Sequence, residues 1–216
     1  MDKMLEELQT KTSDTMMWDS YDQHYDWTWT DRPLLVPLTL NFTAGVMLRD
    51  WTIAKKLKEL GIKKVLDVGS DTGHFLAVLK YHGIDAVGID ANKKACEFIN
   101  SKGQNKCYNV GIQTLVNSNI EDYDCLTCMN ITQAKWENED LKNQFIVWAN
   151  KHFDYAVLSD CTHQDKKWKN FEVIYDFNFL PVYCSPFIIK IAGFFKIEKI
   201  ISYSCIQKLY RLNKHK

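Results

Sequence analysis

Hydrophobic and polar positions follow two different periods along this chain, and the change from one to the other predicts its elements. From Lys63 onward, short apolar runs typical of buried strands are separated by segments in which apolar residues recur at helical spacing. The predicted strands are VLDVG (65–69), AVGID (86–90), KCYNV (106–110), CLTCMN (125–130) and YAVLS (155–159). Strands that alternate with helices predict a parallel sheet covered by helices.

The covering helices are predicted at residues 52–60, 74–83, 93–103 and 139–152, with Gly83 and Gly103 where helix ends favour a left-handed residue. A further helix is predicted over FIIKIAGFF (187–195). KIEKIISYS (196–204) and CIQKLYRL (205–212) follow as strands too closely linked for a parallel crossover, so we expect them to pair antiparallel. The pattern predicts an α/β fold: a doubly wound, mostly parallel seven-stranded sheet with an antiparallel C-terminal strand pair.

The chain before the sheet has a different character, because residues 14–31 (DTMMWDSYDQHYDWTWTD) combine aromatic rings with acidic side chains. We expect residues 1–58 to form an N-terminal cap or lid and residues 59–216 to form the core. If the segment is extended, alternate rings share one face and can stack on a substrate or enclose a cationic amine. The candidate substrate-binding residues are Trp18, Tyr21, Tyr25, Trp27 and Trp29. The alternative is that these rings attach the N-terminus to the helices of the core.

Composition narrows the class of protein. The 216 residues suit one globular domain with an appendage, and 27 basic residues balance 27 acidic ones, which argues against a nucleic-acid partner. No apolar stretch approaches the roughly 20 residues of a membrane span, and the acidic start MDKMLEEL is unlike a secretory signal, so we expect a soluble, cytoplasmic protein. Seven cysteines favour reduced thiols, and strand geometry places Cys125 and Cys128 on opposite faces, as buried thiols rather than a metal pair.

The candidate chemistry lies in VLDVGSDTGHF (65–75), a buried strand that runs through a glycine-bearing turn into a helix. Gly69 and Gly73 let a ligand approach the backbone, and Asp67 can accept hydrogen bonds from an ammonium group or a water. The second strand ends at Asp90, where a carboxylate can accept hydrogen bonds from both hydroxyls of a ribose. These residues predict a nucleoside-containing cofactor.

This pattern resembles the class I S-adenosylmethionine-dependent methyltransferases at VLDVGSDTGHF and VGIDAN. The resemblance implies that S-adenosylmethionine is the cofactor, that Asp67, Gly69 and Gly73 line its methionine moiety, and that Asp90 holds its ribose. It also implies that Ile112 flanks the adenine and that Asn130 borders the transferable methyl group. The remaining residues expected in this cofactor site are Ser70, Asp71, His74, Phe75 and Ala91.

Asp71 departs from the family pattern, because it stands where the motif GxGxG has its middle glycine. Aspartate tolerates left-handed backbone angles, so we expect the turn to persist. The motif is locally similar to the FkbM-type branch, which modifies sugars and polyketides. A nicotinamide dinucleotide site needs GxGxxG to hold a pyrophosphate, and GSDTGHF lacks that spacing.

Methyl transfer to a hydroxyl group needs a base, and LSDCTHQD after the fifth strand offers His163, with Asp160 beside it. A surface histidine without a chemical role is the alternative. Asp160 is followed by Cys161 rather than by a second acid or amide ligand, so we expect no metal. The sequence therefore predicts methyl transfer to a small-molecule or saccharide hydroxyl. The alternatives are an N-methyltransferase acting on a small amine and an inactive binding or scaffold protein, and the oligomeric state stays open.

Overall fold

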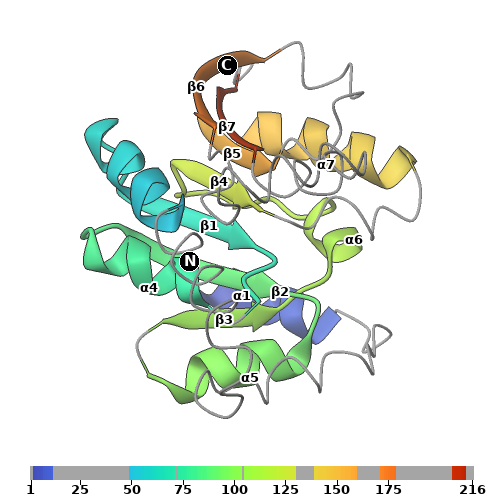
Figure 1. The fold of residues 1–216 in the computed structure, drawn as a ribbon. Coiled ribbons are helices and arrows are strands. Elements are labelled where there is room, and N and C mark those ends of the chain that lie inside the picture. The colour runs from blue at the N-terminus through green and yellow to red at the C-terminus, as the bar shows by residue number, and fades with distance from the viewer. Residues whose placement is uncertain are drawn as a thin grey trace, which may run out of the picture.

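A central sheet lies between two layers of helices in the computed structural model, which describes residues 2–11, 49–71, 73–103, 105–129, 139–159, 171–178 and 206–212 (Figure 1). The helices are α1 (Asp2–Lys11), an unlabelled helix over residues 49–59, α4 (His74–Tyr81), α5 (Lys93–Ser101), α6 (Ile112–Leu115) and α7 (Glu139–His152). The strands are β1 (Lys64–Val68), β2 (Asp85–Asp90), β3 (Lys106–Asn109), β4 (Cys125–Cys128), β5 (Tyr155–Ser159), β6 (Glu172–Asn178) and β7 (Ile206–Arg211).

Within the described residues, the sheet has seven strands in the order β3-β2-β1-β4-β5-β7-β6. Neighbours among β1 to β5 run parallel, and β7 is antiparallel to both β5 and β6. The predicted doubly wound fold with antiparallel C-terminal strands is confirmed. Its predicted helices are also present around β1 to β5, and Gly83 and Gly103 adopt left-handed φ angles of 76° and 65°.

The predicted pairing of CIQKLYRL with KIEKIISYS is wrong. Both edges of β7 are occupied, since residues 206–211 pair with β5 on one side and with β6 on the other. KIEKIISYS and the predicted helix over residues 187–195 lie outside the described residues. The partner that the sequence did not reveal is β6, whose apolar Val173 and Tyr175 are exposed, so its apolar residues do not mark one buried face.

Alternation along the strands divides the core between the two faces of the sheet. Val65 of β1 packs with Phe75 of α4, whereas the next residue, Leu66, packs with Phe145 of α7 on the other face. Cys125 and Cys128 are fully buried and belong to the same two opposite clusters. The prediction of buried core thiols at these two positions is confirmed.

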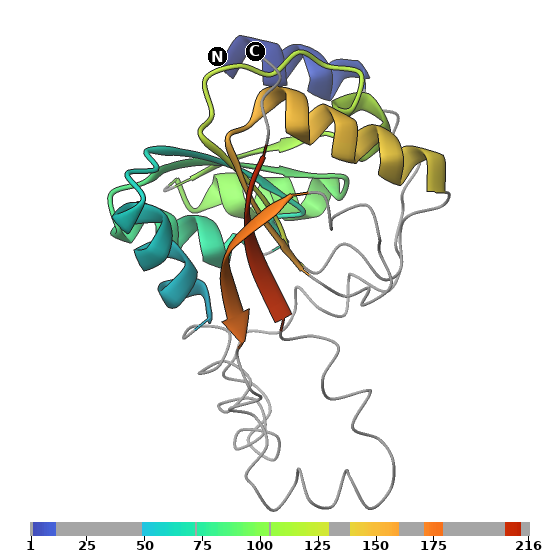
Figure 2. The ribbon, with the colours of Figure 1, turned by 90° about the horizontal axis from the view of Figure 1, so that it is seen from above.

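Helix α1 packs against the sheet on the side of α7 and opposite the helix over residues 49–59 (Figure 2). Its Leu5 and Leu8 are buried in the α7-side cluster, and the Gln9 Oε1 atom accepts a hydrogen bond from the Asn109 backbone N–H at 3.0 Å. The division into a cap over residues 1–58 and a core remains a prediction. None of the helices in the described part of the chain has the length and apolar character that a membrane crossing requires.

Candidate functional site

A tight turn joins β1 to α4 at the edge of the sheet where the parallel strands end. Gly69, Asp71 and Gly73 adopt positive φ angles of 77°, 49° and 74°. The N–H groups of Gly69 and Ser70 donate to the carbonyl oxygen of Ile89 at 2.8 and 3.3 Å, which fixes the turn against β2. Asp71 therefore takes the left-handed conformation expected of it, and the turn persists without the middle glycine.

Asp90 joins this turn to the helix that follows β2. One carboxylate oxygen, Oδ2, accepts from the Asp71 N–H at 3.0 Å, and Oδ1 accepts from the Asn92 N–H at 2.8 Å. A carboxylate oxygen can accept more than one hydrogen bond, so Asp90 can serve a ligand hydroxyl group as well as these N–H groups. The carboxylate predicted to hold a ribose is half-buried and held rigidly at the carboxyl end of β2.

Asp67 is a carboxylate buried at 3% exposure inside the same edge. Its Oδ1 accepts a hydrogen bond of 2.6 Å from the hydroxyl group of Thr127 on β4. Burial raises the pKa of Asp67 to about 6, against the hydrogen bond from Thr127, and the nearby charges of Asp50 and Asp90 add to the rise. Within the described residues Asp67 has no cationic partner. A ligand carrying an ammonium or sulfonium group supplies the positive charge that this carboxylate lacks, so the residues fit S-adenosylmethionine.

Two glycines allow the turn to pack closely. A Cβ atom on Gly73 would lie 2.8 Å from Cγ1 of Ile99 on α5, so this glycine permits α4 and α5 to approach each other. A Cβ atom on Gly88 of β2 would lie 2.5 Å from Oγ of Ser70. Sequence reasoning missed Gly88, although a glycine inside a strand is a known sign of close backbone approach.

The other residues predicted for the cofactor site occupy different environments. The Phe75 side chain is buried in the core cluster beneath α4, so its backbone N–H is the part that remains for a ligand. Ala91 is exposed directly after Asp90, and Ile112 is half-buried at the start of α6. His74 begins α4 and contacts Asp50, a residue that the sequence did not single out.

Several predicted site residues lie outside the described part of the chain. They are Trp18, Tyr21, Tyr25, Trp27, Trp29, Asn130, Asp160 and His163. Their roles stay predictions. The chain connects two of them to the site edge, since Asn130 follows Met129 after β4 and Asp160 directly follows the last residue of β5. No group of three potential metal ligands occurs among the residues that the structure describes.

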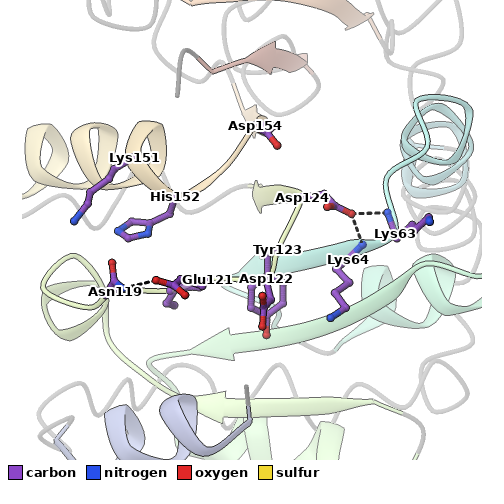
Figure 3. Close-up of a pocket in the computed structure, with 11 residues that line it drawn as sticks. Lys63, Lys64, Asn119, Glu121, Asp122, Tyr123, Asp124, Lys151, His152 and Asp154 are labelled. Carbon is purple, nitrogen blue, oxygen red and sulfur yellow. Dashed lines mark hydrogen bonds between the residues drawn. The ribbon is translucent and has the colours of Figure 1, made fainter. Parts of the chain in front are cut away.

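A hollow of about 610 Å³ lies at the opposite edge of the sheet, where β1, β4 and β5 begin (Figure 3). Here Oδ2 of Asp124 accepts hydrogen bonds from the N–H groups of Lys63 and Lys64 at 2.8 and 2.9 Å. Lys151 and Asp154 line the same hollow, so it carries charges of both signs. It is separate from the turn and from the predicted cofactor residues.

Comparisons with known proteins agree with this geometry. A family model described as a methyltransferase domain matches residues 48–171. No curated protein sequence matches the chain. Among solved structures, magnesium protoporphyrin IX methyltransferase from Synechocystis PCC 6803, with bound S-adenosylmethionine, is 14% identical, with a TM-score of 0.62 over 94% of this chain and 96% of that one.

Other similar structures are larger than this chain. The bifunctional kinase-methyltransferase WbdD is 13% identical, with a TM-score of 0.51 over 80% of this chain and 39% of that one. The sugar N-methyltransferase KedS8 from Streptoalloteichus sp ATCC 53650 is 16% identical, with a TM-score of 0.47 over 67% of this chain and 54% of that one. The chain thus spans 39% of the length of WbdD and 54% of the length of KedS8. By the match over residues 48–171 the chain belongs to the methyltransferase domain family, and its resemblance to the class I S-adenosylmethionine-dependent methyltransferases is confirmed.

Proposed function

We propose that this chain transfers the methyl group of S-adenosylmethionine to a hydroxyl group of a small molecule or saccharide. The main support for S-adenosylmethionine as the cofactor is the arrangement of Asp67, Asp90 and the left-handed turn at one edge of the sheet. A buried carboxylate without a cationic partner among the described residues suits the ammonium and sulfonium groups of this cofactor. Membership of the methyltransferase domain family supports the same cofactor and reaction.

For methyl transfer the protein mainly has to align the acceptor with the methyl group, since the sulfonium already activates that group. The acceptor oxygen attacks the methyl carbon, the bond from carbon to sulfur breaks, and the hydroxyl proton passes to a base. β5 runs parallel beside β4, so it ends at the same edge as Asp67. Asp160 and His163 follow β5 directly in the chain, which supports His163 as the base with Asp160 beside it.

The acceptor class rests on the local similarity of GSDTGHF to enzymes that modify sugars and polyketides. Tryptophan and tyrosine rings suit the apolar faces of a sugar, which supports the residues from Trp18 to Trp29 as its binding surface. A small-molecule or saccharide acceptor also agrees with the balanced charge of the chain.

An acceptor screen with S-adenosylmethionine labelled in its methyl group tests the proposal. We expect label in the O-methyl group of a product when nucleotide sugars and free saccharides are offered, and loss of that product in His163→Ala. Label found on amines alone would replace the proposal by N-methylation. Binding of S-adenosylhomocysteine without transfer to any acceptor would favour the binding or scaffold role.

A further inference from the structure

Asp50, near the start of the helix over residues 49–59, is a carboxylate with 1% exposure that the sequence did not single out. Its Oδ1 lies 2.7 Å from Nε of Arg49, and its Oδ2 lies 2.8 Å from Nδ1 of His74. An ionised carboxylate only accepts hydrogen bonds, so Arg49 donates from Nε and His74 donates from Nδ1. Both oxygens of Asp50 are thus used to hold two basic side chains at the starts of two helices.

The two basic side chains keep donors for another partner. Arg49 uses Nε on Asp50, which leaves its two Nη groups, and His74 in its imidazolium form also donates from Nε2. Neither side chain makes a further hydrogen bond within the described residues. The His74 side chain is 40% exposed and therefore accessible, whereas that of Arg49, at 12%, is largely covered. A planar guanidinium group beside an imidazolium suits a carboxylate ligand.

This cluster of Arg49, Asp50 and His74 lies beside the predicted cofactor site. His74 follows Gly73, the last residue of the turn. The negative charge of Asp50 is close enough to Asp67 to raise the pKa of Asp67, in addition to the larger effect of burial. Asp90 lies on the β2 side of the turn, whereas the cluster joins α4 to the helix that precedes β1. A cofactor with its ribose at Asp90 that extends across the turn toward β1 brings its amino acid end toward the cluster.

We propose that Arg49 and His74 bind the α-carboxylate of S-adenosylmethionine and that Asp50 is the positioning residue that holds them. This inference rests on the proposed function, because it assigns a group of the same cofactor. With His74 as imidazolium the cluster carries one net positive charge, which complements the carboxylate. Asp67 provides the opposite charge for the neighbouring ammonium group. Charges of both signs then match the two charged groups of an α-amino acid.

Decarboxylated S-adenosylmethionine separates this contact from the rest of the site, because it keeps the nucleoside, the sulfonium and the amine and lacks only the carboxylate. We expect calorimetric titration of the unmodified chain to show tighter binding of S-adenosylmethionine than of the decarboxylated compound, by about tenfold or more. His74→Ala and Arg49→Ala should each weaken S-adenosylmethionine by about tenfold and leave the decarboxylated compound within about twofold.

Lys56→Ala is the matched control, because it removes one positive charge from the same helix, where Nζ of Lys56 lies 3.4 Å from Oε2 of Glu59 and 5.0 Å from the ring centre of Tyr175. It should change neither affinity. Asp50→Asn, which keeps the shape of the side chain, should lower the preference for the carboxylate as the two cationic variants do. Thermal unfolding checks that this buried variant folds, and the accessible His74 carries the test independently.

The ratio of the two affinities is a readout that a purely structural role would not move. If His74→Ala and Arg49→Ala weaken both compounds equally, or if the unmodified chain does not prefer the carboxylate, the assignment is wrong and the cluster only joins two helices. If the unmodified chain binds neither compound nor S-adenosylhomocysteine, the proposed function itself fails, and the assignment fails with it.

Discussion

Asp67 and Asp124 lie at opposite edges of one sheet, and their surroundings differ in what the protein supplies. Asp124, at the edge where β1 and β4 begin, accepts two backbone N–H groups that hold these strand starts together. Asp67, at the edge where the same strands end, accepts hydrogen bonds from the hydroxyl groups of Thr127 and Ser70 and has no cation beside it among the described residues. The first carboxylate is satisfied by the fold, whereas the second is satisfied in full only when a cationic ligand binds.

The same contrast separates an edge held by structural contacts from the edge of the proposed cofactor site. At the amino edge, short loops bring charges of both signs into an open hollow. At the carboxyl edge, three buried or half-buried acids, Asp50, Asp67 and Asp90, lie around one left-handed turn. Asp50 is paired with Arg49 and His74, so the cost of placing these acids together falls on Asp67 and Asp90, where a bound cation would offset it.

A pair of glycines at the two ends of α4 gives the largest expected effect. Gly73, at the carboxyl edge, and Gly83, at the amino edge, have φ angles of 74° and 76°, but only the added Cβ of Gly73 meets a neighbour, Ile99. We expect Gly73→Ala to lower the free energy of unfolding by about 2–4 kcal/mol and Gly83→Ala by about 1–2 kcal/mol. Urea titration measures both values. Equal losses would contradict the idea that packing of α4 on α5 constrains the carboxyl edge.

Removal of the Asp90 carboxylate should have the next largest effect, now on binding. We expect Asp90→Ala to weaken S-adenosylhomocysteine by about 1–3 kcal/mol, or roughly 5- to 150-fold, because the hydroxyl groups of the ribose lose their acceptor. Calorimetry measures the affinity, and Asp85→Ala at the exposed start of β2 is the control. An unchanged affinity in Asp90→Ala would remove Asp90 from the cofactor site.

The pH dependence of binding tests the incomplete pairing of Asp67. Burial raises the pKa of Asp67 from 3.8 to about 6. The protonated side chain therefore contributes fully to the stability of the ligand-free chain below about pH 4, and this contribution is lost as the pH rises through about 6. An ammonium group favours the ionised form, so in a His74→Ala background, which removes the imidazole proposed to bind the cofactor, affinity should rise from pH 5 and level off above 7, by about tenfold. Asp67→Asn should flatten this dependence. A slope of the same size in Asp67→Asn would show that another group titrates.

The smallest effect is expected at the amino edge. Asp124→Asn keeps an oxygen that can accept from the N–H groups of Lys63 and Lys64, and it loses only the charge on that acceptor. We expect a loss of about 1 kcal/mol or less in the free energy of unfolding and no change in cofactor affinity. A clear loss of cofactor binding in Asp124→Asn would show that the amino edge also affects the cofactor site, and would contradict the distinction between the two edges.

Periodicity predicted the parts of the fold in which one face or both faces of an element are buried. The strands from Val65 to Ser159 and the helices between them were found because their apolar spacing follows directly from their burial. β6 was missed because Val173 and Tyr175 are exposed at 47% and 40%, so its apolar residues do not mark a buried face. Its pairing with β7 depends on contacts between distant segments, which spacing along the chain does not contain.

The predicted cofactor site shows the same limit. Asp67, Asp90 and the glycines of the turn were found because they are close in sequence and follow strand ends. Thr127 was visible as the one hydroxyl residue in the buried run CLTCM, a signal that could have been used. Asp50 and His74 are 24 positions apart, and only the packing of two helices brings the carboxylate to the imidazole.

Calorimetric titration of the unmodified chain with S-adenosylhomocysteine, with NAD as the matched nucleotide control, tests the cofactor site most directly. The carboxyl edge described above predicts micromolar binding of S-adenosylhomocysteine and no binding of NAD, because the turn lacks the spacing that holds a pyrophosphate. Binding of NAD, or of neither compound, would contradict the assignment of Asp67 and Asp90 to a methyltransferase cofactor.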